Sequence, residues 1–339
     1  MLMGTAGKFW KTLLAGGAGM AALAAVNATI RRNASEPDES ALGGEPQTFQ
    51  WRHGRVFYKT AGANNIGPPL VFVHGIGAGA SSFMWRKNFD ALAADFRVYA
   101  LDLLGFGFSD KPANAPYSAD LYVELIADFI REIIGPEITG PVNNGQGARV
   151  VASSLGAAYC VRVADEHPEL ISALVCVAPT GADYLRARPG MTGAAFYGLL
   201  QSPVLGTSFH NVMTSERSIR DYARTQLFYN PARVTPRLVA QYYANSHQPG
   251  AQNALTAFLS GYLNTDTREA FARLKQPLTL VWGKQDQTNP IEEAVELLRL
   301  NSRTRLEIFD PCRMMPQEED PERFNALVRA AFRSRSAAA

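Results

Sequence analysis

The stretch Arg149-Val-Val-Ala-Ser-Ser-Leu-Gly-Ala-Ala-Tyr-Cys160 joins an apolar run, typical of a buried strand, to a segment with the pattern of a helix. In the turn between them, Ser154 has small residues two positions before it, Ala152, and two positions after it, Gly156. A sharp strand-to-helix turn needs small residues there because neighbouring backbone crowds both positions, and such a turn presents its serine as a nucleophile. The stretch therefore predicts a nucleophile elbow with Ser154 at its tip.

Segments on both sides of the elbow alternate between strands and helices. Two short alternating segments predict an opening β-hairpin, at residues 48–52 and 56–60. Apolar runs predict further buried strands, at residues 70–74, 97–101, 173–178, 278–282 and 305–309. Apolar residues at helical spacing predict helices between them, at residues 118–134, 291–300 and 321–332. This alternation predicts an α/β fold with a mostly parallel sheet flanked by helices.

The rhythm is interrupted once, in residues 181–274, where helical patterns occur without a convincing strand pattern. We interpret this segment as a helical lid inserted into a core made of residues 47–180 and 275–339. Aromatic residues are frequent in the lid. Some of them are expected to form its own small core, and others to line an apolar pocket over Ser154.

The N-terminal residues 1–46 differ from the rest in composition. An uncharged run from Thr12 to Ile30 follows two lysines and ends at Arg31-Arg32, before a polar linker. Its length is near the minimum for a helix that spans a bilayer, so we expect a membrane-associated protein with a single N-terminal segment. A cleaved signal peptide and an alanine-rich soluble helix are the alternatives.

Composition excludes several classes of function. The chain has 339 residues, of which 47% are hydrophobic, enough for one large domain with an inserted subdomain. Its 33 lysines and arginines nearly balance 31 aspartates and glutamates, so electrostatics give no case for nucleic acid as a partner. Three cysteines and five histidines without metal-ligand spacing predict neither a disulfide framework nor a metal site, and we expect no cofactor.

Four motifs occur in the order typical of one superfamily. They are His74-Gly75 after one strand, Asp102-x-x-Gly105-x-Gly107-x-Ser109 after the next, the elbow at Ser154, and Gly283-Lys-Gln-Asp286 after a late strand. With these motifs the chain resembles the α/β-hydrolase superfamily from Thr48 to Phe332. Within it, Trp85-Arg-Lys-Asn88 and the run from Arg97 to Pro112 resemble the chlorophyll dephytylase and pheophytinase group.

The resemblance implies roles for particular residues. A serine is a poor nucleophile at neutral pH, so ester hydrolysis needs a base for its proton and donors for the oxyanion. By resemblance, Ser154 is the nucleophile and Asp286 the acid of the catalytic triad. The backbone N–H groups of Ile76 and Leu155 are the implied oxyanion donors.

The triad base is missing from the position where the superfamily places it. The superfamily has a histidine in a stretch of the form Gly-His-x-Pro-x-x-Glu-x-Pro-Glu, and here the stretch from Arg313 to Glu322 has Met314 at that place. A thioether cannot accept a proton at any relevant pH. No histidine follows Asp286, so a substitute base would have to be His210 or His247 of the lid.

These observations leave two hypotheses for function. The first is a membrane-associated α/β-hydrolase-fold protein that is catalytically impaired and binds an apolar ligand or a protein partner. The alternative is an active serine hydrolase that cleaves a carboxylic ester with a bulky apolar group.

Overall fold

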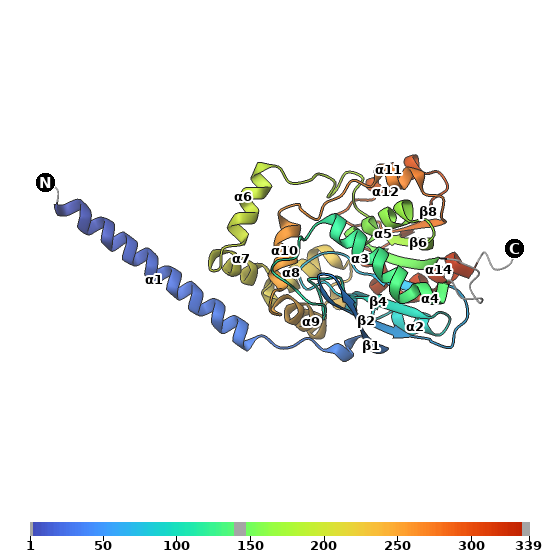
Figure 1. Ribbon diagram of the computed structural model, residues 1–339, viewed down its shortest axis with the longest axis horizontal. Coiled ribbons are helices and arrows are strands. Elements are labelled where there is room, and N and C mark those ends of the chain that lie inside the picture. The colour runs from blue at the N-terminus through green and yellow to red at the C-terminus, as the bar shows by residue number, and fades with distance from the viewer. Residues whose placement is uncertain (1–2, 139–146, 334–339) are drawn as a thin grey trace.

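The computed structural model describes residues 3–138 and 147–333, and an eight-stranded sheet forms its centre (Figure 1). The strands are β1 (Glu45–Trp51), β2 (Gly54–Ala61), β3 (Leu70–Val73), β4 (Val98–Leu101), β5 (Ala148–Ser153), β6 (Ile171–Val177), β7 (Leu278–Gly283) and β8 (Arg305–Phe309). Their order is β1-β2-β4-β3-β5-β6-β7-β8. β2 runs antiparallel to both of its neighbours, whereas all other pairs are parallel. The predicted α/β fold is confirmed.

Helices cover both faces of the sheet, as expected for buried parallel strands. Buried apolar residues of α3, α5 and α12 belong to one hydrophobic cluster on the sheet, and those of α2 and α14 belong to another. The helices of the core are α2 (Phe89–Ala93), α3 (Ala119–Phe129), α4 (Gly135–Ile138), α5 (Ser154–Glu166), α12 (Glu292–Leu300), α13 (Pro316–Glu319) and α14 (Pro321–Arg333).

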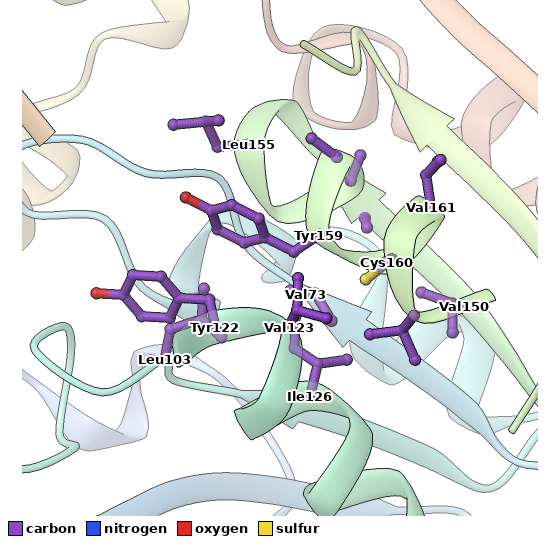
Figure 2. Close-up of a cluster of buried hydrophobic side chains, with 14 of the residues drawn as sticks. Val73, Leu103, Tyr122, Val123, Ile126, Val150, Leu155, Tyr159, Cys160 and Val161 are labelled. Atoms are coloured by element: carbon purple, nitrogen blue, oxygen red, sulfur yellow. The ribbon is translucent and has the colours of Figure 1, made fainter. Parts of the chain in front are cut away.

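Two stacked tyrosines mark the centre of the contact between α3 and α5. Figure 2 shows Tyr122 and Tyr159 side by side, and their ring centroids are 5.4 Å apart. The Tyr122 hydroxyl donates to the Leu104 carbonyl at 3.0 Å, and that of Tyr159 donates to the Leu263 carbonyl at 2.8 Å. Because a buried hydroxyl without a partner costs about 1–3 kcal/mol, the first bond holds the loop after β4 against α3, and the second holds the last part of the lid against α5.

The chain between β6 and β7 leaves the sheet. All of residues 181–274 are described, and they form helices and no strand. These helices are α6 (Met191–Leu200), α7 (Leu205–Met213), α8 (Glu216–Tyr222), α9 (Pro236–Ser246), α10 (Ala251–Leu259) and α11 (Arg268–Arg273). Helices α6 to α10 form a separate group beside the sheet (Figure 1). The domain boundaries at residues 46, 180 and 274 stay predictions.

The N-terminal helix α1 (Met3–Asn33) contains the whole of the uncharged run and projects away from the sheet (Figure 1). It contacts the lid near its C-terminal end, where Asn27 Nδ2 donates to the Val204 carbonyl at 3.1 Å and to Ser208 Oγ at 3.0 Å. In the part of the chain that the structure describes, no helix has both the length and the apolar character needed to cross a membrane. Membrane association stays a prediction.

The elbow depends on a close approach between α5 and the end of β3. A Cβ atom at Gly156 would lie 2.2 Å from the His74 carbonyl oxygen, a distance that no side chain tolerates. The helix can cross at this depth only because glycine lacks that atom. This crossing places Ser154 at the carboxyl end of β5, beside the loop that follows β3.

We predict that Gly156→Ala destabilises the protein, because its methyl group collides with backbone that cannot move without shifting β3. Overpacking of this kind lowers the free energy of unfolding by about 2 kcal/mol or more. Urea denaturation of the variant measures the loss. Gly77→Ala is the matched control, since a Cβ atom there meets nothing within 4 Å, and an equal loss in both variants contradicts the proposed crossing constraint.

Candidate active site

Ser154 has the strained backbone expected of an elbow serine. Its φ is +51°, in the left-handed region that side-chain-bearing residues seldom adopt. The side chain is half-buried and lines a cavity of about 480 Å³. Gly75, in the loop after β3, approaches so closely that its Cβ atom would lie 3.2 Å from the Ser154 Cβ.

The two implied oxyanion donors come from two segments of the chain, since Leu155 follows Ser154 directly and Ile76 lies in the loop after β3. Leu155 is in the first turn of α5, where backbone N–H groups have no partner within the helix and the helix dipole favours negative charge. Ile76 follows Gly75 and lines the same cavity as Ser154. Their assignment as oxyanion donors stays a prediction.

His74 is a structural residue of the loop that carries Ile76. It is fully buried, and its Nε2 accepts the Leu103 backbone N–H at 3.0 Å. The Nδ1 atom therefore carries the proton, which it donates to the Gly75 carbonyl at 2.6 Å. Burial lowers the pKa of His74, so the ring is neutral at pH 7. Both ring nitrogens are engaged, which excludes His74 as a base for Ser154.

Asp102 holds the loop after β4 in place. One of its carboxylate oxygens accepts the Ser82 N–H at 2.7 Å, and the other accepts the Phe108 N–H at 2.8 Å. A Cβ atom at Gly107 would lie 2.1 Å from this carboxylate, which explains the glycine in the motif. The motif that supported the family resemblance is therefore scaffolding.

Asp286 is buried and only half satisfied. Its Oδ1 accepts the backbone N–H groups of Thr288 at 2.9 Å and Asn289 at 3.0 Å, an arrangement that the Asp-x-Thr-Asn sequence favours. Its Oδ2 is buried without a hydrogen-bond partner among the described residues. Burial raises the pKa of Asp286 to about 6, opposed by the two backbone donors. The free oxygen is the one that a triad histidine would use.

Met314 lies on the same cavity as Ser154, as the order of the motifs predicts. The Tyr222 hydroxyl, from α8 of the lid, donates to the Met314 sulfur at 3.9 Å. Asn289, which follows the Asp286 turn, and Tyr184 also line the cavity. The sequence predicted that some of the lid's aromatic residues line a pocket over Ser154, but nothing in the sequence singles out these two tyrosines.

A buried ion pair holds the loop that carries Met314. Arg86 forms a bidentate pair with Glu318, which is nearly inaccessible to solvent. Asn88 donates to the Gln317 carbonyl at 3.0 Å and to Asn325 Oδ1 at 2.9 Å. Removing one partner of such a pair costs about 3–5 kcal/mol because it leaves the other charge buried and alone. Two residues of the Trp85–Asn88 motif thus hold the segment where the resemblance leads one to expect a histidine.

All five histidines lie in the described part of the chain, and each has another role. His53 packs against Trp51 in the hairpin turn, and His167 caps the end of α5. His210 Nε2 bonds to the Ser246 carbonyl at 2.8 Å, and His247 Nδ1 bonds to the Tyr243 carbonyl at 2.8 Å. Neither lid histidine lines the cavity of Ser154, and burial lowers the pKa of both. The structure does not bring a lid histidine to the site.

The cavity is lined mainly by apolar side chains from the core loops and the lid. Its apolar wall consists of Met84, Leu185, Met213, Ile219, Leu227, Leu238, Leu255, Phe258 and Leu259. The polar residues of the lining are fewer and include Ser154, Thr288 and Asn289. A mainly apolar cavity with a few polar groups is typical of a site for an organic molecule.

Comparison with known proteins gives one family. Residues 68–321 match the model for the alpha/beta hydrolase fold. The 2-hydroxymuconate semialdehyde hydrolase of Pseudomonas sp. (strain CF600) is 26% identical over 267 residues, 78% of this chain and 87% of that protein. The narrower resemblance to chlorophyll dephytylases stays a prediction.

Solved structures share the fold. A meta-cleavage product hydrolase from Pseudomonas fluorescens IP01 aligns with a TM-score of 0.64 at 23% identity, over 87% of this chain and 98% of its own. A membrane phospholipase A, described as a bacterial virulence factor, aligns with a TM-score of 0.65 at 21% identity, over the whole of both chains.

The half-satisfied carboxylate predicts a pH-dependent stability. Because the pKa of Asp286 rises to about 6 from its ordinary 3.8, the folded state holds this proton more tightly than the unfolded state. Its contribution favours the fold at low pH and is lost as the pH rises through 6. The Asp286→Asn variant lacks this titration. The free energy of unfolding of the variant minus that of the unaltered protein should therefore be about 1 kcal/mol larger at pH 7.5 than at pH 5.

Urea denaturation at the two pH values measures this difference. Asp310→Asn is the control, since Lys284 lowers the pKa of that exposed carboxyl and keeps it ionised throughout the range. A pH-independent difference for Asp286→Asn would mean that Asp286 is not desolvated as described.

Proposed function

The chain belongs to the alpha/beta hydrolase fold family, and from that premise we propose that it is a slow serine hydrolase of carboxylic esters or related carbonyl compounds with a bulky apolar group. The proposal is carried by one observation: Ser154 stands at an elbow on a large apolar cavity that Met314 also lines. By resemblance, Met314 occupies the position of the base. The curated relative from Pseudomonas is named as a hydrolase of a semialdehyde, which supports a carbonyl substrate.

The proposed chemistry is acyl transfer in two steps. Ser154 Oγ forms a bond to the carbonyl carbon, the oxyanion is held by the N–H groups of Ile76 and Leu155, and the bond to the leaving group then breaks. Water attacks the acyl-serine in the second step and releases the acid. The serine proton passes to solvent and on to the leaving oxygen, because Met314 cannot accept it.

The missing base sets the expected rate. In serine proteases, removing the histidine lowers turnover on the order of 10⁶-fold, equivalent to roughly 8 kcal/mol of transition-state stabilisation. Positioning and the oxyanion donors retain part of the acceleration over water. We therefore expect turnover that is measurable on activated esters and far below that of a complete triad.

A second candidate function is favoured by the contact between Tyr222 and Met314. With the tyrosine hydroxyl 3.9 Å from the sulfur, the lid closes over the place where proton transfer would occur. Such a protein would bind an apolar ligand or a protein partner without turnover. The two functions differ in whether Ser154 forms an acyl intermediate.

Substitution of Met314 by histidine tests the proposal. Met314→His should supply an imidazole next to Ser154 whose other nitrogen donates to the free Oδ2 of Asp286, since the side chains are of similar bulk. Hydrolysis of p-nitrophenyl esters should then increase by at least about 100-fold in kcat. Steady-state kinetics on short-chain and long-chain esters measure the change.

Ser154→Ala in the histidine variant is the control and should abolish the gain. His247→Ala in the unaltered protein should leave turnover unchanged, because that ring does not line the cavity. If Met314→His gives no gain while the fold is retained, the site has lost the triad geometry and the ligand-binding function is preferred.

A further inference from the structure

Large apolar side chains that are exposed to solvent gather on three neighbouring helices. In the described part of the chain, nine such side chains lie on α1, α6 and α7, against six everywhere else. The nine are Met20, Leu23, Val26, Met191, Phe196, Leu199, Leu205, Phe209 and Val212, with exposed fractions between 37% and 92%. A concentration of this kind marks an interaction surface, because scattered exposure is the ordinary condition of a monomer.

The three helices form one connected surface, which we call the α1–α6–α7 face. Phe196 of α6 and Phe209 of α7 contact each other edge to face, with ring centroids 6.2 Å apart. Asn27 of α1 donates to the Val204 carbonyl and to Ser208 Oγ, and its Oδ1 accepts from Asn211 Nδ2 at 2.9 Å. These bonds fix α1 beside α7 and leave Leu205, Phe209 and Val212 outward on one helical stripe.

The charge of the face favours one kind of occupant. No aspartate or glutamate occurs in residues 1–35 or in residues 184–215, although the chain contains 31 in 339 residues. Basic residues do occur there. Arg31 and Arg32 lie in the last turn of α1, and Arg31 lines a second cavity together with Pro203 and Thr207 of the lid. The three helices themselves contain no acidic residue, and α1 carries basic ones. Exposed apolar side chains on such helices complement a lipid surface with anionic headgroups.

We propose that the α1–α6–α7 face docks the protein on an anionic lipid bilayer, with the lid helices α6 and α7 in contact with the lipid together with α1. The face adjoins the cavity of Ser154, since Tyr184 and Leu185, just before α6, and Met213, at the end of α7, line that cavity. An apolar substrate thus passes from the lipid phase to the cavity along the lid.

The docking proposal goes beyond the proposed function and does not depend on it. Binding to vesicles requires no chemistry at Ser154, so Ser154→Ala should bind lipid as the unaltered protein does. If the unaltered protein binds lipid but has no esterase activity, the result counts against the proposed hydrolase alone. If it has esterase activity but does not bind lipid, the result counts against the docking face alone.

Flotation of the full-length protein with vesicles tests the face. The probes are vesicles of phosphatidylcholine alone and of phosphatidylcholine mixed with phosphatidylglycerol. Phe209→Ser with Val212→Ser should lower the partition coefficient by about tenfold on both kinds of vesicle. Arg31→Gln with Arg32→Gln should lower it by about tenfold on the anionic vesicles only.

A matched control uses exposed apolar residues elsewhere. Val295→Ser with Ile308→Ser changes side chains of similar exposure on α12 and β8, and should leave binding unchanged. Phe209→Trp tests lipid contact in a protein that still binds. Brominated lipids should quench the fluorescence of the tryptophan added at position 209. They should not quench the fluorescence of the tryptophan added in the control variant Val295→Trp.

Two results overturn the proposal. In the first, Phe209→Ser with Val212→Ser leaves vesicle binding unaltered, and brominated lipids do not quench the added tryptophan of Phe209→Trp. This result would assign lipid contact to α1 alone. The second is lipid-independent dimerisation that Phe209→Ser with Val212→Ser abolishes, in the absence of vesicle binding, which would make a second copy of the chain the occupant.

Discussion

The crossing of α5 over the carboxyl end of β3 is the constraint on which the rest of the site depends. It brings Gly156 so close to the His74 carbonyl that only a glycine fits, and it forces Ser154 into the left-handed region with a φ of +51°. His74 lies under this crossing and is buried, and burial keeps its ring neutral. The ring bonds to the Gly75 carbonyl and to the Leu103 N–H, which connects the loop after β3 to the loop after β4. His74 therefore has a structural role, although its backbone lies close to the nucleophile elbow.

Under the proposed function, Met314 replaces one member of a cooperative site, and the surroundings of Asp286 and Met314 illustrate the effect. The turn around Asp286 still presents its Oδ1 to two backbone donors, and the loop of Met314 is still held by Arg86 and Glu318. The framework for a base persists, and burial of the free Oδ2 raises the pKa of Asp286 to about 6. An intact framework around an absent imidazole favours a slow hydrolase over a pocket that has been remodelled for another purpose.

Much of this arrangement was predictable because buried parallel strands are unbroken apolar runs. β8 has the bounds expected from its sequence, and β3 and β7 differ from theirs by one residue at one end, whereas β6 begins two residues and ends one residue earlier than predicted. β1 begins earlier than predicted, at Glu45, because its first residues are exposed and pair through the backbone alone. Side chains carry no signal for such pairing, so a pattern of hydrophobicity cannot find it.

Contacts between distant segments were not predictable from the chain. The bond from Tyr222 to Met314 joins residues 92 apart in sequence, and the pair of Arg86 with Glu318 joins residues 232 apart. Ordinary charged and aromatic residues make both contacts, and only the fold selects them. Asn27 was likewise unmarked within an uncharged run, although it fixes α1 to the lid.

The reactivity of Ser154 toward a fluorophosphonate probe tests the central claim most directly, because phosphonylation requires an activated serine and no knowledge of the substrate. We expect labelling confined to Ser154, absent in Ser154→Ala, and slower by several orders of magnitude than in serine hydrolases with a complete triad. Labelling of the unaltered protein at the rate of an ordinary serine esterase would contradict the claim, since some other group would then be acting as the base.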